Sequence, residues 1–177
     1  MKTLKDHINE ALKIGKNLSE WSSYSCQPKT RDELRDIIMK RIREQGPECD
    51  LNDIDTSLIE DMSWLFKESK FNGDISKWDV SSVKSMKGMF FESEFNGDIY
   101  KWDVSNVENM SNMFNGSNFS KDISKWDVSK VENMIAMFAG SKFNYDISKW
   151  KINKDCNTTD MFYFSKIKDE YKPKLPK

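Results

Sequence analysis

The sequence predicts an α/β repeat fold, a solenoid of about five stacked coils with a helix covering its N-terminal end. Three observations lead to this prediction. Tryptophan recurs at a fixed step of 24 residues, at Trp78, Trp102, Trp126 and Trp150. Phenylalanine, isoleucine and methionine keep the same step in columns of their own, which begin at Phe71, Ile75 and Met89. A unit this short cannot bury its apolar side chains alone, whereas stacked copies bury them in one continuous core.

Two apolar spacings alternate within each repeat. In the WDV triplet that begins at Trp78, tryptophan and valine flank an aspartate, which is the period of a half-buried strand. The next apolar residues, Val83, Met86, Met89 and Phe90, lie three and four apart, which is typical of a short helix with one buried face. The sequence therefore predicts that each coil is a strand, a corner, a helical turn and a return.

The corners carry turn and capping signals. Serine is followed three residues later by glutamate at Ser57, Ser105 and Ser129, which is the spacing of a helix capping box. The dipeptide Asn-Gly at 72–73 and 96–97 predicts the return turn, because asparagine and glycine tolerate positive backbone angles.

A helix is predicted ahead of the repeats. Thr30 and Glu33 have capping-box spacing, Leu34 and Ile38 lie on one apolar face with Ile37 and Ile42, and Gly46-Pro47 ends the segment. We expect its apolar stripe to cover the open edge of the first coil.

These signals divide the chain into four parts. We predict an amphipathic leader at 1–20, a capping helix region at 21–50, the repeat solenoid at 51–164 and a flexible basic tail at 165–177. In the last repeat Asp155 and Thr158 replace apolar columns, as expected where a stack ends in solvent.

The composition limits the partners and the compartment. Charged residues make up 32 % of the chain but nearly cancel to a net charge of -1, so no overall field attracts nucleic acid or an anionic membrane. Cys26, Cys49 and Cys156 lack the spacing of a disulfide framework or a zinc site. The sequence has no secretion signal and no apolar stretch long enough to span a bilayer. We expect a protein that is cytoplasmic when synthesised and has a protein as its partner.

The residues do not support enzyme chemistry. His7 is the only histidine, so no hydrolase triad can be assembled, and nucleotide-binding and common metal motifs are absent. We therefore predict no catalytic activity, no cofactor and no metal site.

An aspartate column at Asp55, Asp79, Asp103 and Asp127 admits two interpretations. Stacking would bring successive carboxylates within about 5 Å, as in a cation ladder. Lysines two residues earlier, beginning with Lys77, would instead neutralise them in a salt-bridge lattice, and we favour this second interpretation because calcium needs a cage of six or more oxygens.

The tryptophans are predicted to be core residues, since an aromatic column at a fixed step alternates with charged residues. A mixed-charge surface then remains on the same segments, and extended surfaces of this kind bind partners in repeat proteins. The alternative is that these side chains are simply solvated. The candidate partner-binding face consists of Lys77, Asp79, Tyr100, Lys101, Asp103, Lys125, Asp127 and Lys149.

The repeat, DIS-x-WDVS-x-V-x-x-M-x-x-MF-x-x-S-x-FN, resembles the repeat of BspA-like leucine-rich-repeat proteins over residues 51–164. The resemblance implies a right-handed leucine-rich-repeat-type solenoid with one parallel sheet face. Members of that family are generally assigned adhesion or protein-binding roles on bacterial surfaces, so a surface adhesin is one functional alternative. The chain departs from them in lacking a secretion signal or a lipoprotein anchor.

The first eleven residues, MKTLKDHINEA, resemble the capsid-targeting leader of internal proteins of large tailed phages. The resemblance implies cleavage after an aliphatic-x-Glu triplet, which here is Ile8-Asn9-Glu10, so the cut would fall between Glu10 and Ala11. A phage internal or structural protein, packaged in the virion, is therefore a second functional alternative.

Overall fold

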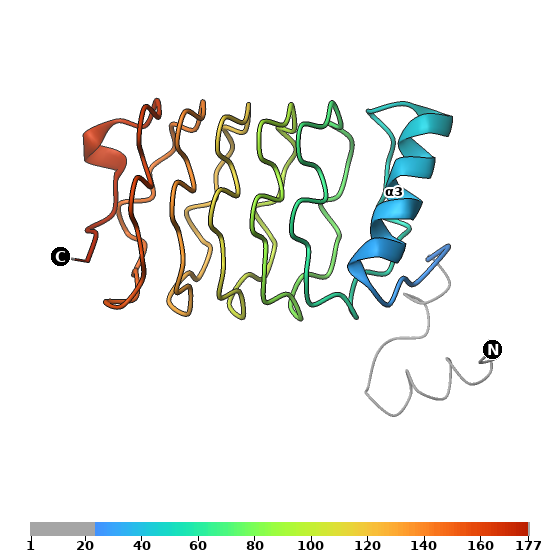
Figure 1. Ribbon diagram of the computed structural model, residues 1–177, viewed down its shortest axis with the longest axis horizontal. Coiled ribbons are helices and arrows are strands. Elements are labelled where there is room, and N and C mark those ends of the chain that lie inside the picture. The colour runs from blue at the N-terminus through green and yellow to red at the C-terminus, as the bar shows by residue number, and fades with distance from the viewer. Residues whose placement is uncertain (1–23, 177) are drawn as a thin grey trace.

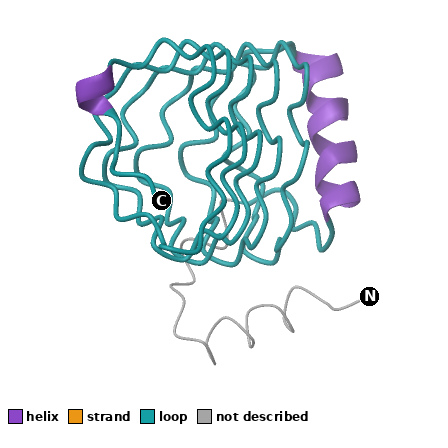
Figure 2. Ribbon diagram, turned by 60° about the vertical axis from the view of Figure 1, so that its left-hand side comes forward, coloured by secondary structure: helices purple, strands orange, loops and turns teal. Residues whose placement is uncertain are grey.

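The computed structural model describes residues 24–176, and the chain there winds into coils stacked along one axis (Figure 1). We number the five coils 1 to 5 by the 24-residue step: 47–70, 71–94, 95–118, 119–142 and 143–166. Helix α3, Arg31–Gln45, covers one end of the stack, and the 3₁₀ helix η1, Asp169–Tyr171, lies at the other (Figure 2). Isolated parallel bridges link equivalent residues of successive coils, but no extended strand or sheet forms within residues 24–176.

Helix α3 begins and ends where the sequence predicts. Thr30 is the N-cap, and its hydroxyl accepts from the backbone N–H of Glu33 at 3.2 Å. The Glu33 carboxylate accepts from the backbone N–H of Lys29 at 2.7 Å. Leu34 and Ile38 are fully buried in the same core as the coils. The predicted capping helix and its cover over coil 1 are therefore confirmed.

The backbone joins neighbouring coils along a segment that we call the turn ribbon, residues 61–68, 85–92, 109–116, 133–140 and 157–164. Parallel bridges connect its first residues from coil to coil: Asp61, Ser85, Asn109, Asn133 and Asn157. In each of coils 1 to 4, four alternate N–H groups of the ribbon donate to carbonyls of the next coil's ribbon, with N···O distances of 2.7–2.9 Å. Coil 3 donates in this way from Met110, Asn112, Phe114 and Gly116.

The prediction of a short helix on this segment is wrong. Bonds over three residues, such as Met89 N–H to the Met86 carbonyl at 3.1 Å, form turns that bury the same residues as a helix would. The N–H groups between them point to the next coil instead of along a helix axis. Positive φ angles, such as 57° at Asn112 and 67° at Gly116, recur every four residues and permit this alternation. The three-residue apolar spacing was therefore a signal of turns.

The WDV segments do not form strands either, although their inward alternation is confirmed. The four repeat tryptophans are only 4–5 % exposed, and the Trp78 and Trp102 rings stack with centroids 6.4 Å apart. Each indole N–H donates to a backbone carbonyl of the preceding coil, as Trp102 does to Ile75 at 3.2 Å. A side chain thus makes the link between coils that a strand would make with its backbone.

The predicted serine capping boxes are also not formed. The backbone N–H of Ser105 donates to the Asp103 carboxylate at 3.1 Å, and Ser129 donates to Asp127 at 3.0 Å. These are Asx turns, in which aspartate bonds the backbone two residues later. No helix follows them, so there is no helix N-terminus for the serine to cap.

Two columns of phenylalanine fill the centre of the stack. Phe90 and Phe95 are fully buried, with ring centroids 4.4 Å apart, and the pair repeats as Phe114 with Phe119 at 4.3 Å. Phe90 also stacks on Phe114 of the next coil at 5.6 Å. The predicted continuous core is therefore confirmed.

The C-terminal segment packs against coil 5 as far as Leu175, whereas the sequence predicted a flexible basic tail. Ile167 is buried in the core, and Tyr171 and Leu175 pack against it. The Ile147 N–H donates to the Tyr171 carbonyl at 3.0 Å. The apolar residues between the lysines explain the difference, because they cover a part of coil 5 that would otherwise face water.

The predicted leader, with Glu10 and Ala11, lies outside the described residues, as does His7. None of the helices in residues 24–176 has the length and apolar character required to cross a membrane.

Candidate protein-binding face

The candidate partner-binding residues lie together on the side of the stack formed by the WDV segments. Lys77, Lys101, Lys125 and Lys149 are all exposed, because each precedes a tryptophan that points inward. Asp103 and Asp127 are exposed as well, and Asp79 and Tyr100 are half-buried. We call this side of the coils the charged face. The stacking thus brings residues from four repeats onto one surface.

The aspartates of the charged face form Asx turns at the corners of the coils, where each carboxylate accepts from a backbone N–H two residues later. Asp127 accepts hydrogen bonds from the side chain and the backbone N–H of Ser129, and these bonds lower the pKa of its carboxyl group. Lys130 and Lys151 lower it further through their charges. The Asp127 carboxylate is therefore the form that the fold stabilises.

The predicted salt-bridge lattice is wrong. Within residues 24–176, no ion pair closer than 4.0 Å involves any of the four lysines of the charged face. The reason is that one carboxylate oxygen of each aspartate accepts from its own corner, while the lysines extend into solvent. Lys84 and Glu108, which lie on another side of the coils, do form a pair across neighbouring coils at 3.6 Å.

Two adjoining hollows cross the charged face over coils 3 to 5. One, of about 260 Å³, is lined by Asp122, Ser124, Lys125, Tyr145, Asp146 and Lys149. The other, of about 490 Å³, is lined by Asn96, Asp98, Tyr100, Lys121, Asp122 and Tyr145. Asp122 and Tyr145 belong to both, so the two form one groove across the repeats.

Part of this groove belongs to the face predicted from the sequence, namely Tyr100, Lys125 and Lys149. Tyr145, which is 41 % exposed, and the acidic column that includes Asp122 and Asp146 were not predicted. Tyr145 stands in a column that contains glycine or lysine in coils 2 to 4, and this departure from the repeat was the available signal.

Acidic and basic groups both line the groove. The pKa of the Asp146 carboxyl is lowered by hydrogen bonds from Ser148 and by the charge of Lys149. These contacts therefore favour the carboxylate form of Asp146. With its carboxylates, ammonium groups and two tyrosine rings, the groove can form ion pairs, hydrogen bonds and aromatic contacts with a polypeptide.

The described residues bring no cluster of metal ligands together: no group of three or more His, Cys, Asp or Glu among them is placed to hold a metal ion. Cys49 and Cys156 are buried free thiols, and burial raises the pKa of both. A raised pKa disfavours the reactive thiolate.

Stacked coils with a fixed 24-residue step and a shared aromatic core define a repeat protein. The chain belongs to the family described as Mycoplasma protein of unknown function, DUF285, whose model matches twice, over residues 38–118 and 93–171. That description names neither BspA-like proteins nor leucine-rich repeats. No curated protein and no solved structure gives a significant match to the chain.

Proposed function

We propose that the chain is a non-enzymatic scaffold that binds another protein through its charged face. The observation that carries the proposal is the groove over coils 3 to 5, whose lining combines two tyrosines, three lysines and three aspartates. The lysines there form no close ion pair within the described residues, so their charges are available to an acidic partner. Repeat proteins use extended surfaces of this kind for recognition.

Charge reversal tests the proposal. In Lys101→Glu/Lys125→Glu, two exposed cations of the charged face become anions. We expect at least a tenfold loss of binding to a partner recovered from host lysate, because like charges across an interface repel. Thermal unfolding is expected to change little, since exposed substitutions away from special features have small effects.

The matched control reverses two exposed lysines at another corner of the coils, Lys70→Glu/Lys142→Glu, with the same change in net charge. It is expected to bind as the unchanged chain does. Equal loss in both variants would attribute binding to net charge alone and would reject a specific face. Failure of the unchanged chain to bind any protein reproducibly would reject the scaffold function.

We also propose that the coils are a variant of the right-handed leucine-rich-repeat-type solenoid that the BspA-like resemblance implies. The common features are the repeat length, the columns of apolar residues and the parallel stacking of coils. The departure is that the links between coils fall on the turn ribbon. An experimental structure with left-handed coils would reject this assignment.

Packaging in a phage virion is a second candidate, and the Ile8-Asn9-Glu10 triplet supports it. Mass spectrometry of purified virions is the test. A peptide that begins at Ala11 supports packaging, and a chain found only uncleaved in the cytosol rejects it.

A further inference from the structure

The hydrogen bonds of the turn ribbon all run the same way along the stack, so unpaired N–H groups remain at one end of the ribbon and unpaired carbonyls at the other within residues 24–176. At all four junctions between coils, alternate N–H groups of one coil donate to carbonyls of the next. In coil 4 the donors are Met134, Ala136, Phe138 and Gly140. The equivalent N–H groups of coil 5 have no hydrogen-bond acceptor within residues 24–176, and they belong to Thr158, Asp160, Phe162 and Phe164. We call these four groups the open edge.

The open edge keeps the backbone conformation of the paired coils. Asp160 has a φ of 55° and Phe164 one of 52°, against 52° and 63° at Ala136 and Gly140 in coil 4. The four N–H groups therefore point along the stack, to the position that a further coil would occupy. The C-terminal segment lies nearby, with the Lys172 ammonium 5.7 Å from the centre of the Phe162 ring and Pro176 lining a hollow with Thr158, but it accepts no hydrogen bond from these four groups as far as residue 176.

Only an acceptor can satisfy this edge. A β-strand edge presents N–H and C=O groups alternately, but the open edge presents N–H groups alone along the ribbon. Two copies of the chain therefore cannot pair edge to edge, since donors would face donors. The occupant must present a row of backbone carbonyls at two-residue spacing, as an extended polypeptide does when it adds to an existing ladder.

A second copy does not offer such a row in its folded state. The outward carbonyls of coil 1 belong to Asp61, Ser63, Leu65 and Lys67, and they accept no hydrogen bond within the described residues. Helix α3 covers that end, and Leu34 and Ile38 are fully buried there. Arg31, Arg35 and Met39 of α3 border a hollow of about 310 Å³ together with Ser63, Leu65 and Lys67. The helix therefore stands where the open edge of a second copy would have to pack, and an unrelated polypeptide is the simpler occupant.

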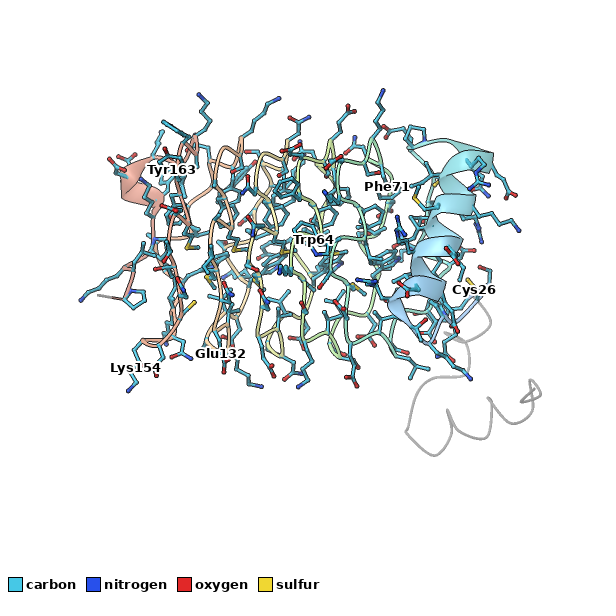
Figure 3. The ribbon with its side chains drawn as sticks, viewed as in Figure 1. Cys26, Trp64, Phe71, Glu132, Lys154 and Tyr163 are labelled. Carbon is cyan, nitrogen blue, oxygen red and sulfur yellow. The ribbon has the colours of Figure 1, made fainter. Side chains whose placement is uncertain are left out.

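Exposed aromatic side chains adjoin the open edge. Tyr163 is 58 % exposed and Phe164 is 78 % exposed, and their ring centroids lie 4.2 Å apart. Tyr163 lies on the coil farthest from α3 (Figure 3). Large exposed aromatic side chains at one place mark interaction sites. They would contact apolar side chains of a segment laid along the ribbon.

We propose that the open edge binds an extended segment of another polypeptide, whose alternate carbonyls accept from Thr158, Asp160, Phe162 and Phe164 and whose apolar side chains cover Tyr163 and Phe164. This site is separate from the charged face and does not depend on the function proposed for it. The bound segment would add one more row to the ladder of hydrogen bonds and would cover the end of the stack at coil 5.

Amide hydrogen exchange measured by NMR on the full chain tests the proposal. The probe is a synthetic peptide with the sequence of residues 84–92, whose carbonyls at Ser85, Lys87, Met89 and Phe91 accept from coil 1 in the fold. In the protein alone, we expect the four amides of the open edge to exchange rapidly, while the equivalent amides of coil 4 exchange slowly. With the peptide at ten times its Kd, open-edge exchange is expected to slow about tenfold.

Two results would overturn the proposal. One is unchanged open-edge exchange at millimolar peptide. The other is slow exchange of these amides in the protein alone, which would mean that the chain itself covers them. The amides of coil 4 serve as the internal reference in both measurements.

Variants separate this site from the rest of the molecule. Phe164→Ser removes an exposed ring and is expected to weaken peptide binding at least fivefold, while Leu58→Ser, at a 49 % exposed leucine in coil 1, leaves it unchanged. Lys101→Glu/Lys125→Glu is also expected to leave peptide binding unchanged. A result that rejects partner binding by the charged face can therefore be distinguished from one that rejects peptide binding by the open edge. Equal affinity of Phe164→Ser and the unchanged chain would reject the site.

Discussion

The two sides of each coil are joined to their neighbours by different means. On the turn ribbon, backbone donates to backbone, and one column holds Trp64, Gly88, Asn112, Ala136 and Asp160. On the charged face, a side chain makes the link, and its column holds tryptophan in coils 2 to 5. A backbone ladder tolerates varied side chains, whereas a link made by an indole requires that residue. The comparison predicts that substitutions of equal size have unequal effects on the two sides.

The largest effect is expected at the indole column. Trp102→Ala removes a buried ring that stacks on Trp78 and deletes the donor to the Ile75 carbonyl. We expect the free energy of unfolding to fall by about 3–5 kcal/mol, from cavity formation and the lost bond. Chemical denaturation measures this change. A loss below about 1 kcal/mol would show that the indole does not hold the coils together.

A subtler change isolates the hydrogen bond. Trp126→Phe keeps an aromatic ring but leaves the Ile99 carbonyl without its donor. We expect a loss of about 1–3 kcal/mol, the cost of an unsatisfied buried acceptor together with some lost packing. The control is Phe91→Leu, an aromatic substitution at a half-buried position of the turn ribbon, which is expected to cost less.

Substitutions at the two columns of the turn ribbon that have positive φ and varied side chains are expected to cost less than at the indole column, unless a side chain blocks the space. At Gly140, with a φ of 63°, a methyl group meets no close atom, so Gly140→Ala should cost about 1 kcal/mol from the left-handed conformation alone. At Gly88, with a φ of 59°, a methyl group would collide with the Trp64 ring. Gly88→Ala is therefore expected to cost about 1 kcal/mol more, from the displaced ring.

A double-mutant cycle measures the collision. In a Trp64→Ala background the cost of Gly88→Ala should fall to that of Gly140→Ala, since only the backbone conformation remains to oppose it. Additive effects of Trp64→Ala and Gly88→Ala would show that the ring does not cover the glycine.

The smallest effect is expected at the corner of the charged face. Asp127→Ala removes the acceptor of the Asx turn and should cost about 0.5–1 kcal/mol at neutral pH. Because the folded-state pKa of Asp127 is lowered, its contribution is full above the unfolded value, near 3.9, and is lost as the pH falls through the folded value. Thermal unfolding of the two proteins should therefore converge in acid.

Asp127→Asn is the matched control, because asparagine forms the same turn at Asn153, where it accepts from the Asp155 N–H at 3.1 Å. We expect it to be closer in stability to the unchanged chain than Asp127→Ala is. A pH-independent difference between Asp127→Ala and the unchanged chain would contradict the account of the carboxylate.

The sequence was sufficient to predict the stacked repeats, the aromatic core and the helix at one end. The invariant step of Trp78, Trp102 and Trp126 requires equivalent positions in successive coils, and Thr30 with Glu33 marks a helix start by local chemistry alone. The conformation within each coil was not predictable in the same way. Buried residues three apart, such as Met86 and Met89, are compatible with a helix or with successive turns. Only pairing between distant residues distinguishes the two.

For the candidate site, too, local features could be predicted from the sequence and relations between distant residues could not. Exposure of the lysines follows from their position next to the inward tryptophans, and the sequence predicted it. The groove depends on Tyr145 lying beside Asp122 of the neighbouring coil, a relation across 23 residues that the local pattern does not contain. The open edge exists because the N–H groups of each coil donate to carbonyls of the next coil. No residue type indicates this direction in the sequence.

Scalar couplings through hydrogen bonds, measured by a long-range HNCO experiment, test the ladder most directly. The structure predicts correlations from the amide nitrogen of Phe114 to the carbonyl carbon of Met137 and from that of Asn112 to that of Ile135. A correlation from Phe114 to Met110, four residues earlier in the same coil, would indicate a helix and would contradict the turn ribbon.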